Sequence, residues 1–88
     1  MRFPTKEKIY QIDGDVWGVM ISWWGDDCYQ ATVFSDYKTK TVPLVLEEYT
    51  IEPAFKMFNK LRIENIGSFE LFYMVVCGAL RNAIRGGM

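Results

Sequence analysis

The segment from Ser68 to Arg85 constrains the fold more than any other part of the chain. Ser68 is a candidate N-cap residue, and the glycines at positions 86 and 87 favour the end of a helix. Between Leu71 and Leu80 there is no charged residue and no Asn, Gln, Ser or Thr. The sequence therefore predicts a long helix that must be covered on more than one side.

An apolar stripe follows the predicted helix at steps of three and four residues. Its members are Phe69, Phe72, Tyr73, Val76, Leu80, Ala83 and Ile84. Leu71, Met74, Val75 and Cys77 lie off this stripe, so either another helix or a second copy of the chain has to cover them. The uncharged stretch is shorter than the roughly 20 residues of a membrane span, and we expect no membrane insertion.

Gly78 stands in the middle of this helix, where a glycine costs roughly 1 kcal/mol relative to alanine. A small residue there lets another backbone approach closely, although packing inside one subunit also accounts for it. We predict a homodimer that uses the helix face left over after the sheet is covered. Its interface residues are Leu71, Met74, Val75 and Gly78.

Three segments in the first half of the chain have the alternation of β-strands. Lys6 to Ile12 is a weak candidate, Val16 to Trp24 is the strongest, and Cys28 to Ser35 follows as a return strand. Turn residues separate them at Asp13-Gly14-Asp15 and Gly25-Asp26-Asp27. Both faces of the segment from Val16 to Trp24 are largely apolar, which places it at the centre of a sheet with its second face at least partly covered.

The segment from Thr41 to Tyr49 is ambiguous. Its alternation suits a strand that Pro43 confines to a sheet edge, and a short helix beginning near Pro43 is the alternative. Thr50 is a credible N-cap residue for a helix from about Ile51 to Arg62, with Pro53 tolerated in its first turn. Because strands precede helices, we expect a single α+β domain over residues 1–88, in which a three- or four-stranded antiparallel meander is followed by two helices packed on one face.

The hairpin DVWGVMISWWGDDCYQATVFSDY, from Asp15 to Tyr37, resembles a hairpin of Tudor or SH3-like β-barrels. The shared pattern is a strand, an acidic turn and a return strand that together line an aromatic cage. The long apolar helix from Ser68 to Arg85 departs from the five-stranded plan of that family. The resemblance is therefore confined to the hairpin and carries no function with it.

The chain has no histidine, which excludes Ser-His and Cys-His nucleophiles and His-ligated zinc sites. Cys28 and Cys77 are too few for a structural zinc cluster, and we expect both to be free thiols without a catalytic role. The sequence has no phosphate-binding glycine loop and no calcium loop. We therefore predict a protein that is not an enzyme and that uses no metal and no cofactor.

The net charge of −1 gives no expectation of non-specific binding to duplex nucleic acid. The first residues, MRFPTKEKIYQ, are charged and lack the apolar core of a signal peptide, so we expect a cytoplasmic protein. Three Trp, five Tyr and six Phe are many for 88 residues. A domain of this size has limited interior volume, and we expect some of these rings to lie at a binding surface.

Two surfaces are candidates for binding. The first surrounds the central hairpin, where rings and carboxylates suit a cationic group of a partner protein, and it consists of Trp24, Asp26, Asp27 and Tyr37. The second is the basic set Lys56, Lys60 and Arg62, which would serve a nucleic-acid or nucleotide-binding module together with hairpin aromatics.

The main hypothesis is a small interaction protein that masks or bridges a partner protein. Inhibitors, immunity proteins and adaptors of phages and bacteria are the analogous class. The nucleic-acid-binding module is the alternative. Salt separates the two, because phosphate contacts weaken steeply as salt increases and an aromatic protein interface does not.

Overall fold

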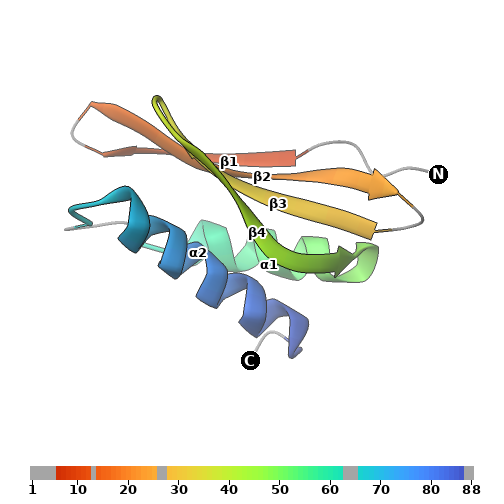
Figure 1. The fold of residues 1–88 in the computed structure, drawn as a ribbon. Coiled ribbons are helices and arrows are strands. Elements are labelled where there is room, and N and C mark those ends of the chain that lie inside the picture. The colour runs from red at the N-terminus through yellow and green to blue at the C-terminus, as the bar shows by residue number, and fades with distance from the viewer. Residues whose placement is uncertain (1–5, 13, 26–27, 63–65, 87–88) are drawn as a thin grey trace.

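The computed structural model of the chain describes residues 6–12, 14–25, 28–62 and 66–86. In these ranges the chain forms an antiparallel sheet followed by two helices (Figure 1). The elements are β1 (Lys6–Ile12), β2 (Asp15–Gly25), β3 (Cys28–Ser35), β4 (Thr39–Glu47), α1 (Glu48–Lys60) and α2 (Phe69–Ile84). The strands pair in the order β1-β2-β3-β4, so the sheet is a meander. The predicted α+β class and element order are confirmed.

Both helices lie on the same face of the sheet and run in opposite directions (Figure 1). The core fills the space between the two layers. From the sheet it takes Val19, Ile21, Tyr29, Ala31, Val33, Val42 and Leu46. From the helices it takes Ile51, Ala54, Phe55, Phe58, Phe72, Val76, Cys77, Ala79, Leu80 and Ala83. The helix face of the sheet is therefore closed, and its other face, which we call the outer face, is not covered by either helix.

The central position of β2 follows from its alternation. Val19 and Ile21 are fully buried and pair with Val33 and Ala31 of β3. Trp17 packs against Phe72 of α2 with ring centroids 5.2 Å apart. The strand prediction is confirmed for this face.

The segment around Pro43 is a strand, and the alternative of a short helix is wrong. β4 is an edge strand, and its register with β3 shifts between Gln30 and Thr32. Pro43 lies opposite this irregularity, where its missing N–H costs no regular ladder bond. β1 is the other edge, so the sheet is open and differs from the closed barrel of the Tudor and SH3-like families.

The start of α1 differs from the prediction. The helix begins at Glu48, with Glu47 as the N-cap residue, so Thr50 lies inside it. The Thr50 hydroxyl donates to the Glu47 carbonyl oxygen at 2.6 Å instead of capping a following N–H group. Pro53 consequently lies beyond the first turn and removes one backbone hydrogen bond of the helix.

The prediction for α2 is confirmed at both ends. The Leu71 N–H donates to the Ser68 hydroxyl oxygen at 3.2 Å, which makes Ser68 the N-cap residue. Gly86 follows the helix with a φ of 110°, a conformation that glycine adopts without steric cost. Tyr73 fixes the middle of α2 to the sheet, because its hydroxyl donates to the Thr41 carbonyl oxygen at 3.1 Å. No helix in the described ranges has the length and apolar character that crossing a membrane requires.

Candidate interaction surfaces

The outer face of the sheet is the first exposed surface with apolar side chains. Residues paired across an antiparallel sheet point to the same side, so the partners of the non-core positions define this face. Its members include Glu7, Ile9, Val16, Gly18, Met20, Ser22, Gln30, Thr32, Phe34, Thr41, Val45 and Glu47. Ile9 and Val45 are exposed, while Met20 and Phe34 are half-buried.

The Phe34 ring packs directly on the backbone of Gly18 at the centre of this face. The ring lies over Gly18 so closely that a Cβ atom on Gly18 would meet the ring and would also come within 2.8 Å of the Lys8 carbonyl oxygen. Gly18 in turn pairs with Ile9 of β1. An apolar band therefore crosses three strands at the level of Gly18.

The charges of the sheet are distributed unequally between its two faces. Lys6 and Lys8 pair with core residues of β2 and so point to the helix side. Their ammonium groups lie 5.0 Å from the Phe55 ring centroid and 5.6 Å from the Tyr10 ring centroid, respectively. Lys40 likewise lies 4.4 Å from the Tyr73 ring centroid. Among the described residues, the outer face carries no Lys or Arg.

Both edges of the sheet have features that oppose the addition of another strand. Lys6 and Lys8 on β1 are charges that point inward from an edge strand, and β4 contains Pro43. Natural sheets use these same features to prevent pairing at their edges. A partner is therefore better accommodated on the outer face than along either edge.

The outward side of α2 is the second exposed surface with apolar side chains. Leu71, Met74 and Val75 are 50%, 67% and 36% exposed. They flank Gly78, and we call these four residues the α2 stripe. A Cβ atom on Gly78 would have no atom within 4 Å. Packing inside the subunit therefore does not explain the glycine, and α1 supplies only part of the cover that this helix needs.

The predicted hairpin site is spread over the molecule. Trp24 is 61% exposed at the end of β2 that leads to β3, and Tyr37 is 89% exposed in the connection from β3 to β4. Those connections lie at opposite ends of the sheet, separated by about 20 Å from Trp17 to Trp23 at 3.3 Å per residue. The structure does not bring Trp24 and Tyr37 together. Positions 26 and 27, the predicted acidic members of this site, lie outside the described residues.

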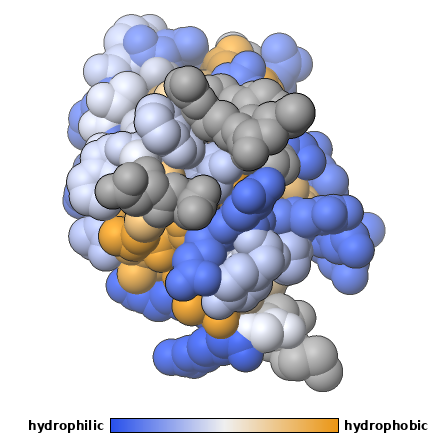
Figure 2. All heavy atoms as spheres, turned by 90° about the vertical axis from the view of Figure 1, so that its right-hand side faces the viewer, coloured by the Kyte–Doolittle hydropathy of each residue, from blue (hydrophilic) through white to orange (hydrophobic). Residues whose placement is uncertain are grey.

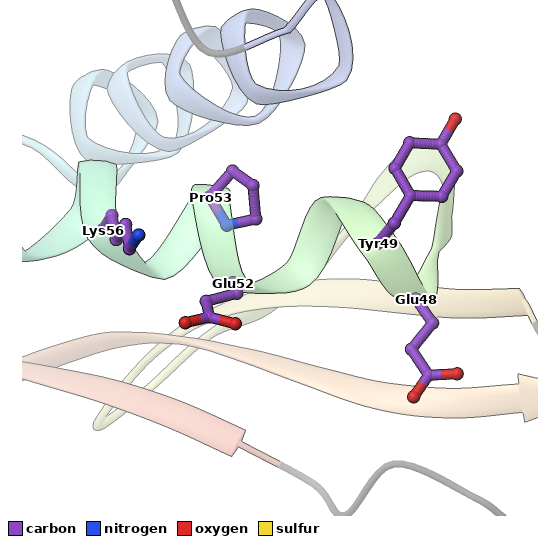
Figure 3. Close-up of a pocket in the computed structure, with 5 residues that line it drawn as sticks. All are labelled: Glu48, Tyr49, Glu52, Pro53 and Lys56. Atoms are coloured by element: carbon purple, nitrogen blue, oxygen red, sulfur yellow. The ribbon is translucent and has the colours of Figure 1, made fainter.

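The predicted basic set lies on and after α1. Lys56 and Lys60 are exposed one turn apart, and Arg62 follows the helix. Lys56 also lines an open groove with Tyr49, Pro53 and two carboxylates, those of Glu48 and Glu52 (Figure 3). All five groove residues come from α1, and the carboxylates offset the charge of the lysine. The groove therefore does not form a concentrated anion site.

A small pocket lies between β4 and α2. It is lined by Pro43, Tyr73, Met74, Cys77 and Arg81. Burial, reinforced by the nearby Cys77 thiol, raises the pKa of the Tyr73 hydroxyl, which is already engaged with β4. Cys77 is a free, buried thiol, and Cys28 is a free, half-buried one. In the described part of the chain, no group of three or more Cys, Asp or Glu residues could hold a metal ion.

Figure 2 shows the end of the molecule at which β2 ends, β3 begins and the C-terminal end of α2 lies. Hydrophobic side chains surface there in separate patches among hydrophilic ones. The outer face belongs to the sheet and the α2 stripe to the helix layer, so these two apolar surfaces lie on different layers of the fold. Comparison with protein-family models, with curated protein sequences and with solved structures finds no match to this chain.

Sequence reasoning included the α2 stripe and missed most of the outer face. The second apolar face of β2, with Val16 and Met20, was the available signal. This signal does not identify Ile9, Phe34 and Val45, because strand pairing decides which residues join the outer face.

Proposed function

We propose that the protein is a non-enzymatic protein-binding module that acts as a homodimer and masks or bridges a partner protein. One observation carries the proposal: the described part of the chain leaves two separate apolar surfaces uncovered, one on each layer of the fold. The α2 stripe serves self-association, and the outer face serves the partner. Large exposed apolar areas on small proteins typically mark interaction sites.

The outer face has the composition of an interface centre. Its apolar part is formed by Ile9, Met20 and Phe34, Glu7 lies beside Met20 on the edge strand β1, and Glu47 lies at the end of β4. Protein interfaces are depleted in charge at their centre and enriched in aromatic residues and methionine. Trp24 extends the surface toward the end of β2, and it retains its predicted role as a partner contact. Tyr37 belongs to a separate contact at the other end of the sheet.

We assign the module to small inhibitors, immunity proteins and adaptors of the phage and bacterial type, acting in the cytoplasm. The assignment rests on size, on the aromatic content and on the two surfaces, and it is an analogy of class. The predicted nucleic-acid site at Lys56, Lys60 and Arg62 stays a prediction. No feature of the described structure favours it, since Glu48 and Glu52 lie beside Lys56.

Affinity capture with matched surface variants tests the proposal. We expect wild-type protein and the α1 variant Lys60→Glu to capture the same partner, and Val45→Glu or Trp24→Ala to retain at least tenfold less of it. Circular dichroism must show that every variant is folded. Equal capture by Val45→Glu would contradict a partner on the outer face. Nucleic acid that copurifies, leaves at high salt and requires Lys60 would instead favour the basic set.

A further inference from the structure

Viewed down the helix axis, the residues of the α2 stripe point in nearly the same direction as Gly78. At 100° per residue, Leu71, Met74 and Val75 project within about 60° of the direction of Gly78. Phe72, Val76 and Leu80 project to the opposite side and are fully buried. The same side of α2 continues beyond the stripe toward the C-terminus with Arg81, Asn82 and Arg85, which are exposed. Its first half is therefore apolar and its second half is basic.

This asymmetry limits how a second copy can pack on α2. A parallel pair would place Arg81 beside Arg81 of the second copy, with repulsion between like charges. An antiparallel pair centred on Gly78 would place Leu71 against Arg85 of the second copy. An antiparallel pair centred between Met74 and Val75 instead superimposes the two apolar halves.

The antiparallel pair centred between Met74 and Val75 also makes the two copies complementary in shape and in charge. Positions whose numbers add to 149 face each other, so Leu71 lies over Gly78 of the second copy, where a Cβ atom would have nothing within 4 Å of its own chain. Glu70 lies on the same flank of the helix as Arg81, and the twofold axis brings Glu70 within reach of Arg81 of the second copy. The Lys38 ammonium of the same chain already lies 3.4 Å from one oxygen of the Glu70 carboxylate, and the other oxygen is the one offered to Arg81. The backbone N–H of Glu70 and Lys38 lower the pKa of the Glu70 carboxyl, so it carries its charge at neutral pH.

We infer that two copies of the chain pair through antiparallel α2 helices about a twofold axis between Met74 and Val75, with Leu71 seated on Gly78 and Glu70 paired with Arg81 across the interface. The inference rests on the homodimer of the proposed function and specifies its geometry. It leaves the outer faces of both sheets free, because α2 lies on the other layer. The dimer therefore presents two partner surfaces and acts by bridging.

Charge reversal tests the geometry. We expect Glu70→Lys and Arg81→Glu each to raise the dimer dissociation constant about 5- to 30-fold, since each breaks two ion pairs per dimer and creates repulsion. The double variant Glu70→Lys/Arg81→Glu should return to within about threefold of wild type, and Lys60→Glu on α1 should leave the constant unchanged. Sedimentation equilibrium over a dilution series measures these constants, and circular dichroism checks folding.

The outcomes separate the geometry from the dimer itself. A double variant as weak as the single variants, with wild type dimeric, would overturn the antiparallel arrangement and leave the homodimer standing. A wild type that is monomeric at all concentrations would overturn both.

Discussion

The Tyr10 hydroxyl on β1 donates a hydrogen bond of 2.8 Å to the carbonyl oxygen of Phe58 on α1, 48 residues later in the chain. The Tyr10 ring also meets the Phe72 ring of α2 edge-on, with centroids 5.6 Å apart. One side chain of the first strand therefore contacts both helices. Burial raises the pKa of Tyr10 to about 12, so the hydroxyl keeps its proton over the ordinary pH range.

Tyr10→Phe keeps the ring and removes the hydrogen bond. We expect a loss of about 1 kcal/mol in the free energy of unfolding, because the Phe58 carbonyl also accepts from Leu61 and is not left without a partner. In a domain of this size the melting temperature should fall by roughly 4 to 8 °C. Thermal unfolding followed by circular dichroism measures this change. Tyr37→Phe, at an exposed site, is the control. An equal fall in the melting temperature of Tyr37→Phe would show that the hydrogen bond from Tyr10 to Phe58 does not account for the loss.

Alkaline pH should destabilise the protein through the same residue. The folded-state pKa of Tyr10 is about 12 against an ordinary value of 10.0, so above pH 10 the folded state holds a proton that the unfolded state has lost. This contribution is fully present below pH 10 and is lost as pH rises through about 12. The free energy of unfolding, measured with urea between pH 8 and 12, should decline less in Tyr10→Phe than in the wild-type protein. Some decline should remain, because burial also raises the pKa of Tyr73.

Gly18→Ala tests the apolar band of the outer face. The added Cβ atom would meet the Phe34 ring and the Lys8 carbonyl oxygen. Either the ring must move or β1 and β2 must separate. We expect a loss of roughly 1 to 3 kcal/mol in the free energy of unfolding. Gly67→Ala is the control, because a Cβ atom there would have no atom within 4 Å. Similar stabilities of the two variants in chemical denaturation would show that Phe34 does not lie on Gly18.

The strands and α2 could be predicted from sequence because their signals are local. The alternation around Val19 and Ile21, the cap at Ser68 and the glycine at position 86 each act within a few residues of the element they define. The predicted start of α1 was wrong for an equally local reason. Thr50 followed by Pro53 resembles a cap and a first-turn proline, whereas the Thr50 hydroxyl bonds back to the Glu47 carbonyl oxygen.

The interaction surfaces depended on information that is not local. Trp24 and Tyr37 lie in neighbouring parts of the sequence, yet an eight-residue strand carries the chain from one end of the sheet to the other between them. Conversely, Ile9 and Phe34 are distant in sequence, and the pairing of β1, β2 and β3 brings them to the same level of the outer face. Strand register, which turns and packing determine together, was the missing information.

Gly78→Ala should separate folding from association. Alanine restores about 1 kcal/mol of helix propensity, and its methyl group meets no atom of its own subunit, so the monomer should become more stable to urea. The same methyl group occupies the space into which Leu71 of the second copy would fit, so the dimer should dissociate more readily. Asn59→Ala on α1 is the control, since it also raises helix propensity but lies at an exposed position outside α2. Tighter or unchanged association in Gly78→Ala would show that no second backbone approaches the helix at this glycine.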